Sequence, residues 1–86
     1  MKDLEKQFKA LANRRRLGIL KYLRTNREVA VGELAHAIHL SFRSTSKHLG
    51  VLVAAGILEK EQRGPQVFYC LTDAPASVVK HALSLF

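Results

Sequence analysis

Cysteine is nearly absent from the chain, proline occurs twice, tryptophan does not occur, and acidic residues are half as frequent as basic ones. The one thiol, Cys70, has no partner for an internal disulfide, which excludes a disulfide-stapled scaffold and favours a reducing compartment. The longest apolar run, Val51 to Leu58, is too short to cross a bilayer, and the acidic residues near the N-terminus do not suit a signal peptide. We therefore expect a cytoplasmic protein that does not associate with a membrane.

Apolar side chains and positive charge are what the chain does contain. Its 86 residues, 48% of them hydrophobic, suffice for one small core, so we predict a single domain over residues 1–86. Fourteen basic against seven acidic residues give a formal charge of +7, which favours a polyanionic partner such as nucleic acid. No Ser/His/Asp, Cys/His or paired-carboxylate arrangement is evident, so no enzyme is predicted.

Hydrophobic periodicity predicts two helices at the start of the chain. Apolar residues at helical spacing place them at about 3–12 and 14–25, and Asn13 is suited to be the N-cap of the second. One long helix is the alternative. A β-branched stretch at 29–31 then indicates a brief strand or a turn.

A pair of helices joined by a tight turn is predicted next. The first is short and ends near His39. Ser41 is a favourable N-cap for the second, which carries apolar residues on one face, runs to about Ala55 and stops at Gly56.

The periodicity changes to two over residues 57–71, around a polar tip at 63–66, which predicts a β-hairpin. Pro75 is expected in the first turn of a last, largely apolar helix. The order predicts a mainly α fold with a small β-hairpin wing. This is a winged helix-turn-helix, with the helix-turn-helix at about 32–55 and the wing at about 57–71.

Short segments spread over nearly the whole chain resemble one family. They are FKALAN at 8–13, RLGIL at 16–20, ELA at 33–35, LSFRSTSKHLGVL at 40–52, AGIL at 55–58 and YCLT at 69–72. These segments resemble the ArsR/SmtB family of winged-helix repressors. The resemblance implies a cytoplasmic homodimer that dimerises through its first and last helices, binds an inverted repeat in double-stranded DNA and represses transcription.

The predicted second helix of the pair carries the candidate DNA contacts. Arg43 and Lys47 lie one turn apart on a face directed away from the core, where both can donate to guanine edges or phosphates. Phe42 either packs against the preceding helix or contacts a thymine methyl, and His48 either contacts a phosphate or makes a hydrogen bond within the protein. The predicted DNA-binding residues are Ser41, Phe42, Arg43, Ser44, Ser46, Lys47, His48, Arg63 and Gln66.

Two further positively charged regions are candidates for the DNA backbone. Arg63 and Gln66 flank the wing tip, where a phosphate or minor-groove contact is expected and plain turn polarity is the alternative. Arg14 and Arg15 are candidate phosphate contacts at the start of a helix. Arg16 is expected to have a structural role, paired with a carboxylate.

No metal site and no cofactor are predicted. The family resemblance places paired cysteines in a stretch that corresponds to 31–35, which has none, and the last helix supplies only Asp73 and His81 to the family's interhelical site. His36 and His39 have a spacing that suits a metal, but two exposed histidines are favoured. Two alternatives stay open: a winged-helix module for protein assembly, and a regulator that senses metal or redox state through these histidines or the single thiol.

Overall fold

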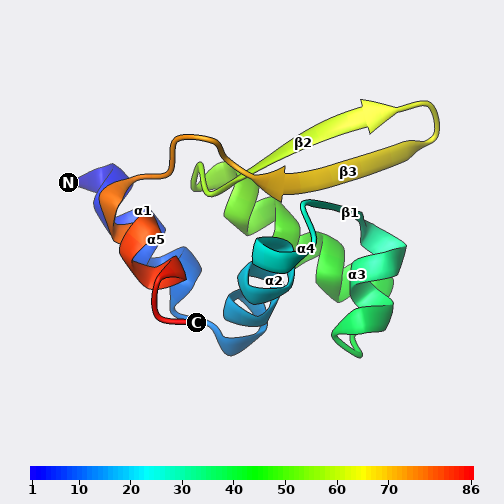
Figure 1. Cartoon of the computed structure of the whole chain (residues 1–86), viewed down its shortest axis with the longest axis horizontal. Coiled ribbons are helices and arrows are strands. Elements are labelled where there is room, and N and C mark those ends of the chain that lie inside the picture. Colours follow the sequence, from blue (N-terminus) through cyan, green and yellow to red (C-terminus); the bar gives the residue numbers. More distant parts are fainter.

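The computed structural model describes residues 1–86. Its elements are α1 Lys2–Leu11, α2 Arg14–Thr25, β1 Glu28–Ala30, α3 Val31–Ala37, α4 Phe42–Ala54, β2 Leu58–Arg63, β3 Gln66–Leu71 and α5 Ser77–Leu83 (Figure 1). This is the predicted winged helix-turn-helix, in which α3 and α4 form the helix-turn-helix and the β2–β3 hairpin forms the wing. None of the helices has the length and apolarity that a membrane span requires.

The break between α1 and α2 is fixed by Asn13. Its backbone is extended, and its side-chain oxygen accepts hydrogen bonds from the backbone N–H groups of Arg15 at 2.9 Å and Arg16 at 3.1 Å. Two of the N–H groups that a helix leaves unpaired at its start are thereby satisfied. The predicted N-cap is confirmed, and the alternative of one long helix is wrong.

The two helices of the helix-turn-helix end in the same backbone motif. After α3, the Leu40 N–H donates to the Ala35 carbonyl across a residue with positive φ, His39 at 56°. After α4, the Ile57 N–H donates to the Leu52 carbonyl across Gly56, whose φ is 74°. Both are Schellman ends, which favour glycine at the left-handed position. Only the second has a glycine there.

Replacing His39 by glycine should therefore stabilise the fold. A left-handed conformation costs a side chain about 1 kcal/mol. Glycine avoids this cost, but it raises the entropy of the unfolded chain, which offsets part of the gain. We expect His39→Gly to raise the free energy of unfolding by about 0.5 kcal/mol, measured by urea denaturation. Gly56→Ala, the reverse change at the matching position, should lower it. A loss of stability in His39→Gly would contradict this description of the turn.

The three strands form one antiparallel sheet in the order β1-β3-β2. The predicted hairpin is confirmed, with a two-residue tip in which Gly64 has a φ of 61° and fits the first position of a type II′ turn. The stretch predicted as a strand or turn is a strand that starts at Glu28, and it pairs with β3 through Val29 opposite Tyr69. This third strand covers only the base of the hairpin.

The core lies between α2, α4 and the base of the sheet. Ile19, Leu20 and Leu23 enter it from α2, and Leu49 and Leu52 enter it from α4, all with at most 2% of their surface exposed. The apolar periodicity that predicted these helices is thus the periodicity that fills the core. Burial of one face of α4 leaves its opposite face in solvent.

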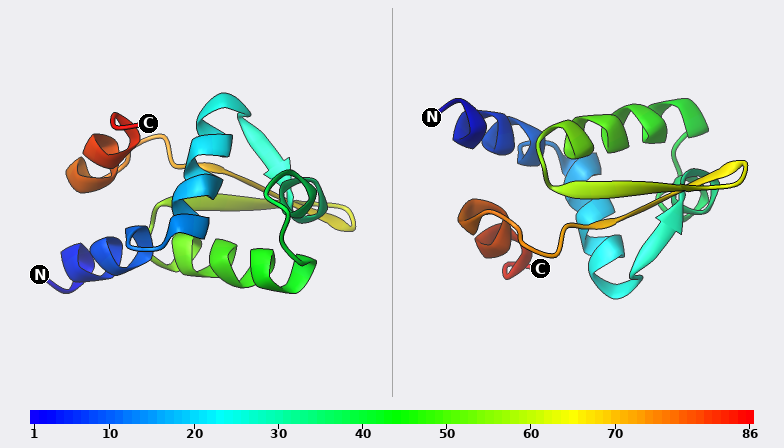
Figure 2. Two further views of the ribbon diagram at one scale, coloured as in Figure 1. Left: turned by 90° about the horizontal axis from the view of Figure 1, so that it is seen from below. Right: turned by 90° about the horizontal axis from the view of Figure 1, so that it is seen from above.

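Helices α1 and α5 pack against each other at one end of the molecule, and the wing tip lies at the other end (Figures 1 and 2). Pro75 is not in the first turn of α5 as predicted, because the helix starts at Ser77 with Ala76 as its N-cap. The helix also ends at Leu83. There the Arg24 guanidinium of α2 donates to the Leu83 carbonyl at 2.8 Å and the Phe86 carbonyl at 3.2 Å.

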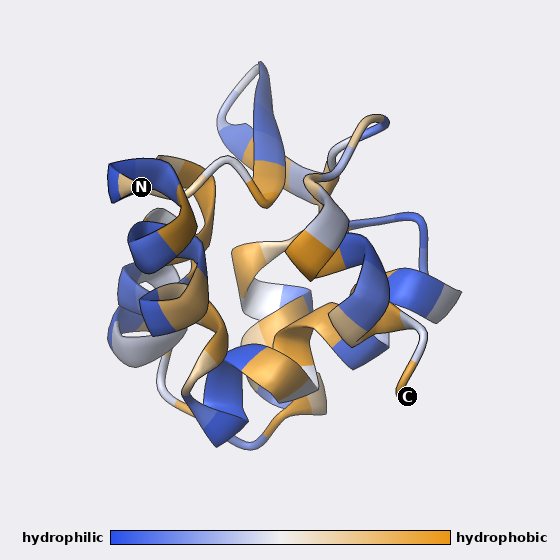
Figure 3. Cartoon of the chain, turned by 90° about the vertical axis from the view of Figure 1, so that its left-hand side faces the viewer, coloured by the Kyte–Doolittle hydropathy of each residue, from blue (hydrophilic) through white to orange (hydrophobic).

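The end of the molecule formed by α1 and α5 exposes several large apolar side chains. Figure 3 views the molecule from this end, where hydrophobic and hydrophilic residues alternate along the helices. Leu4 and Phe8 are exposed on α1, Met1 at its N-cap, and Leu85 and Phe86 after α5, whereas the exposed residues of α5 itself are polar. Several exposed large apolar residues at one end of a small domain are typical of an interaction surface. Dimerisation through the first and last helices stays a prediction, for which these residues are the candidates.

Candidate nucleic-acid interface

The start of α4 is fixed by its N-cap. The Ser41 hydroxyl accepts the Ser44 backbone N–H at 3.1 Å, as predicted. Arg43 and Lys47 then project from the exposed face, and neither has an ion-pair partner within the chain. Thr45 is fully buried on the opposite face. Two cations one turn apart are thereby held on a rigid helix with their donors free.

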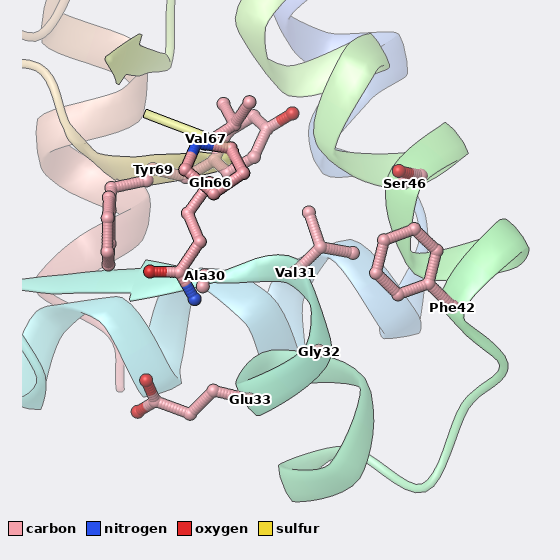
Figure 4. A pocket seen from close by; sticks show the side chains of 11 residues that line it. Ala30, Val31, Gly32, Glu33, Phe42, Ser46, Gln66, Val67 and Tyr69 are labelled. Carbon is pink, nitrogen blue, oxygen red and sulfur yellow. The ribbon is translucent and has the colours of Figure 1, made fainter. Parts of the chain in front are cut away.

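Phe42 and Ser46 border a groove between α4, the start of α3 and the wing. The groove has a volume of about 550 Å³, and Val31 and Gln66 lie on its other sides (Figure 4). The Phe42 ring is 62% exposed, so it adds little to the core. Ser44 and Ser46 are half-buried. The first turns of α4 and the wing therefore face the same open space.

Arg16 links α1 to α4. Its guanidinium donates to the Ala10 carbonyl at 2.6 Å and the Lys9 carbonyl at 3.1 Å, and it lies 3.2 Å from Nδ1 of His48. The predicted carboxylate partner is wrong. The last carbonyls of α1 are unpaired and form the negative end of the helix dipole, so they attract the guanidinium in place of a carboxylate.

The contact with Arg16 defines the state of His48. A guanidinium has donors only, so Nδ1 of His48 is the acceptor and the proton of the neutral ring is on Nε2. Burial, and then the positive charges of Arg16, Arg15 and Lys47, hold the pKa of His48 below its usual value. The predicted hydrogen bond within the protein is confirmed. Nε2–H is left as a neutral donor on the flank of α4.

This environment predicts how stability depends on pH. Because the pKa of His48 is lower in the folded than in the unfolded chain, the unfolded state binds more protons, and stability falls as pH drops below about 6.5. In His48→Asn, the side-chain oxygen can replace Nδ1 as acceptor without titrating. We expect the urea-derived free energy of unfolding to fall less between about pH 7.5 and about pH 5.5 in this variant. An equal fall in both proteins would contradict the assignment.

Arg14 and Arg15 are exposed at the start of α2 and have no ion-pair partner. They open a helix without an acidic residue in its first turn, so a negative partner is missing where the helix dipole favours one. Both remain predicted phosphate contacts.

The wing residue Arg63 is held by other side chains. Its Nη atoms donate to both carboxylate oxygens of Glu28 at 2.6 Å and 2.9 Å, and its Nε donates to Glu61 at 2.5 Å. The guanidinium also lies 4.8 Å above the centre of the Phe68 ring. Arg63 lowers the pKa of Glu28, since it stabilises the charged carboxylate. Gln66, opposite Arg63 on β3, is exposed.

The candidate metal and redox residues are scattered. No group of three or more His, Cys, Asp or Glu side chains gathers anywhere in the chain. His36 and His39 are exposed at the end of α3 and in the turn after it. Burial and the nearby carboxylates, Glu59 first, raise the pKa of Cys70, which lowers the thiolate fraction at neutral pH. Neither the two exposed histidines nor Cys70 has the surroundings typical of a metal or redox sensor site.

Comparison with known proteins covers most of the chain. A helix-turn-helix domain family matches residues 11–61. The transcriptional activator HlyU of Vibrio cholerae is 42% identical over 66 residues, which are 77% of this chain and 60% of HlyU. The arsenical resistance operon repressor of Bacillus subtilis is 32% identical over 73 residues, which are 85% of this chain and 70% of the repressor. The match thus spans 60% to 70% of the length of these two relatives.

Solved structures of similar proteins superpose on nearly the full length of this chain. HlyU of Vibrio cholerae superposes with a TM-score of 0.80 at 35% identity, covering 96% of this chain and 86% of the other. A homodimeric winged helix-turn-helix DNA-binding domain of Mycobacterium bovis has a TM-score of 0.82 at 30% identity, covering 98% and 74%. This protein belongs to the ArsR/SmtB family of winged helix-turn-helix transcriptional regulators.

Proposed function

We propose that the protein is a homodimer that binds double-stranded DNA at an inverted repeat and represses transcription in the cytoplasm, without a metal or other cofactor. The observation that carries the proposal is the pair Arg43 and Lys47, exposed and unpaired on the face of α4 opposite the core. An α-helix of this kind fits the major groove, where base edges are distinguishable.

Each part of the interface has its own kind of contact. Arg43 is placed for bidentate donation to guanine, and Lys47 for a base edge or a phosphate. The helix start and Nε2–H of His48 suit phosphates, and Phe42 suits a thymine methyl. The proposed contact residues on α4 and at its N-cap are Ser41, Phe42, Arg43, Ser44, Ser46, Lys47 and His48.

Contacts outside α4 would fix the register of the protein on the duplex. Arg14 and Arg15 are placed to neutralise phosphates from the start of α2. Of the two predicted wing contacts, Gln66 has its side chain free for the adjacent backbone or minor groove. Such contacts position the protein and carry little sequence information.

Dimerisation supplies the second recognition helix. The end of the molecule formed by α1 and α5, where Leu4, Phe8, Leu85 and Phe86 are exposed, is proposed as the interface, which leaves the start of α4 and the wing tip at the far end of each subunit (Figure 2). A two-fold dimer of this kind would read two half-sites separated by about one helical turn. Repression is proposed because several relatives are named repressors, among them that of Bacillus subtilis.

Fluorescence anisotropy tests the proposal. The purified chain is titrated into labelled duplex from upstream of its own gene and into a scrambled duplex, over a series of salt concentrations. We expect tight binding that prefers the upstream duplex and weakens steeply with salt. Weak binding that is equal for both duplexes would contradict the proposal and favour a module for protein assembly.

A further inference from the structure

The hairpin has no structural support of its own at its tip. β1 pairs with β3 only from Phe68 to Cys70, so the outer residues of β2 and β3 have only each other as backbone partners. Two-stranded ribbons are marginally stable in water and twist freely. A wing that must reach a fixed place on DNA needs another restraint.

Arg63 supplies a restraint that crosses the sheet. It is the last residue of β2, and its guanidinium binds both carboxylate oxygens of Glu28, the first residue of β1, 35 positions earlier. Planar, bidentate arginine–carboxylate pairs fix orientation as well as distance. The contact with Glu61 and the position above Phe68 hold the same guanidinium from two more sides. Three of its five donors are used within the protein.

We propose that Arg63 and Glu28 form a clamp that positions the wing for DNA, and that Arg63 does not itself contact the duplex. This inference rests on the proposed function, since it assigns the clamp a role in DNA binding. A direct phosphate contact would require the Arg63 guanidinium to break its hydrogen bonds to the Glu28 carboxylate. Glu28, an acidic residue that would repel a phosphate, thereby becomes a residue that favours binding.

Glu28→Gln distinguishes the two roles by the sign of its effect. If the clamp positions the wing, loss of the carboxylate weakens binding to the preferred duplex by about threefold, the size of an exposed ion pair. If Arg63 contacts phosphate, the variant frees its guanidinium and binding tightens. Asp73→Asn is the matched control, because it removes a negative charge near Glu28 without touching Arg63.

Arg63→Ala gives a second readout through salt dependence. As a positioning residue, Arg63 leaves the slope of log affinity against log salt unchanged when it is removed, whereas loss of a phosphate contact lowers the slope by about one. The double variant Glu28→Gln/Arg63→Ala should bind no more weakly than Arg63→Ala, because both changes break the same clamp. Tighter binding by Glu28→Gln or a lowered slope in Arg63→Ala would overturn the inference.

Backbone relaxation of the free protein tests the clamp without DNA. We expect the ¹⁵N order parameters of Gly64 and Gln66 to fall in Glu28→Gln and to stay unchanged in Asp73→Asn. Unchanged wing order in Glu28→Gln would overturn the inference by itself. If the wild-type chain shows no preference among duplexes, the proposed function fails. If it shows one and Glu28→Gln strengthens it, only the clamp fails.

Discussion

The double variant Arg43→Ala/Lys47→Ala should lose about thirtyfold or more in affinity for the preferred duplex, because each specific base contact contributes about 1–3 kcal/mol. Its stability should change by less than about 0.5 kcal/mol, because both side chains are exposed and neither has an ion-pair partner. Anisotropy measures the first quantity and urea denaturation the second. Loss of binding in a fully folded protein would assign the loss to the interface.

Charge alone requires a control. Lys21→Ala/Arg27→Ala also removes two positive charges, but from exposed positions on α2 and in the loop after it. We expect this variant to bind both duplexes slightly more weakly and to keep the preference of the wild type. Equal loss of preference in the two double variants would mean that positive charge, and not the face of α4, determines DNA binding.

Arg16→Ala should have the largest effect on stability among the charged residues. The change removes hydrogen bonds to the Ala10 and Lys9 carbonyls and leaves Nδ1 of His48 without its donor. Hydrogen bonds from charged groups contribute about 1.5 kcal/mol or more each, so we expect a loss of about 2–3 kcal/mol in the free energy of unfolding. Urea denaturation with a fixed m-value provides the measurement.

Arg16→Lys separates charge from geometry. A lysine keeps the positive charge near the end of α1 but lacks the planar fork that reaches three acceptors from two helices. It should recover less than half of the lost stability. Full recovery would show that the helix dipole alone accounts for the effect, and no loss in Arg16→Ala would contradict the role of Arg16 as a link between α1 and α4.

Local signals in the sequence predicted much of the fold. Asn13 and Ser41 are caps whose partners lie two or three residues ahead, and both were predicted from residue type and position. Gly56 and the hairpin tip likewise depend on backbone conformations that glycine favours. His39 adopts the left-handed backbone conformation at the end of α3 that glycine usually adopts, and its residue type does not predict this.

Contacts between segments distant in the sequence could not be predicted. Arg63 and Glu28 are 35 positions apart and meet only because β1 joins the hairpin, so the sequence predicts a DNA contact or turn polarity for Arg63 and gives no sign of this ion pair. Arg16 was correctly predicted to be structural, but its acceptors are backbone carbonyls, which every residue possesses and no sequence pattern marks. Arg43 and Lys47 could be predicted because helical periodicity alone places them opposite the core.

Chemical-shift mapping shows whether the first half of α4 is the part of the protein that reads DNA. ¹⁵N-labelled protein is titrated with the preferred duplex and, separately, with the scrambled duplex. We expect the preferred duplex to shift the amides of residues 41–48 most strongly, with smaller shifts at 14–15 and 63–66 and little change in α1 and α5. Shifts concentrated in α1 and α5, or the same shifts with both duplexes, would contradict this expectation.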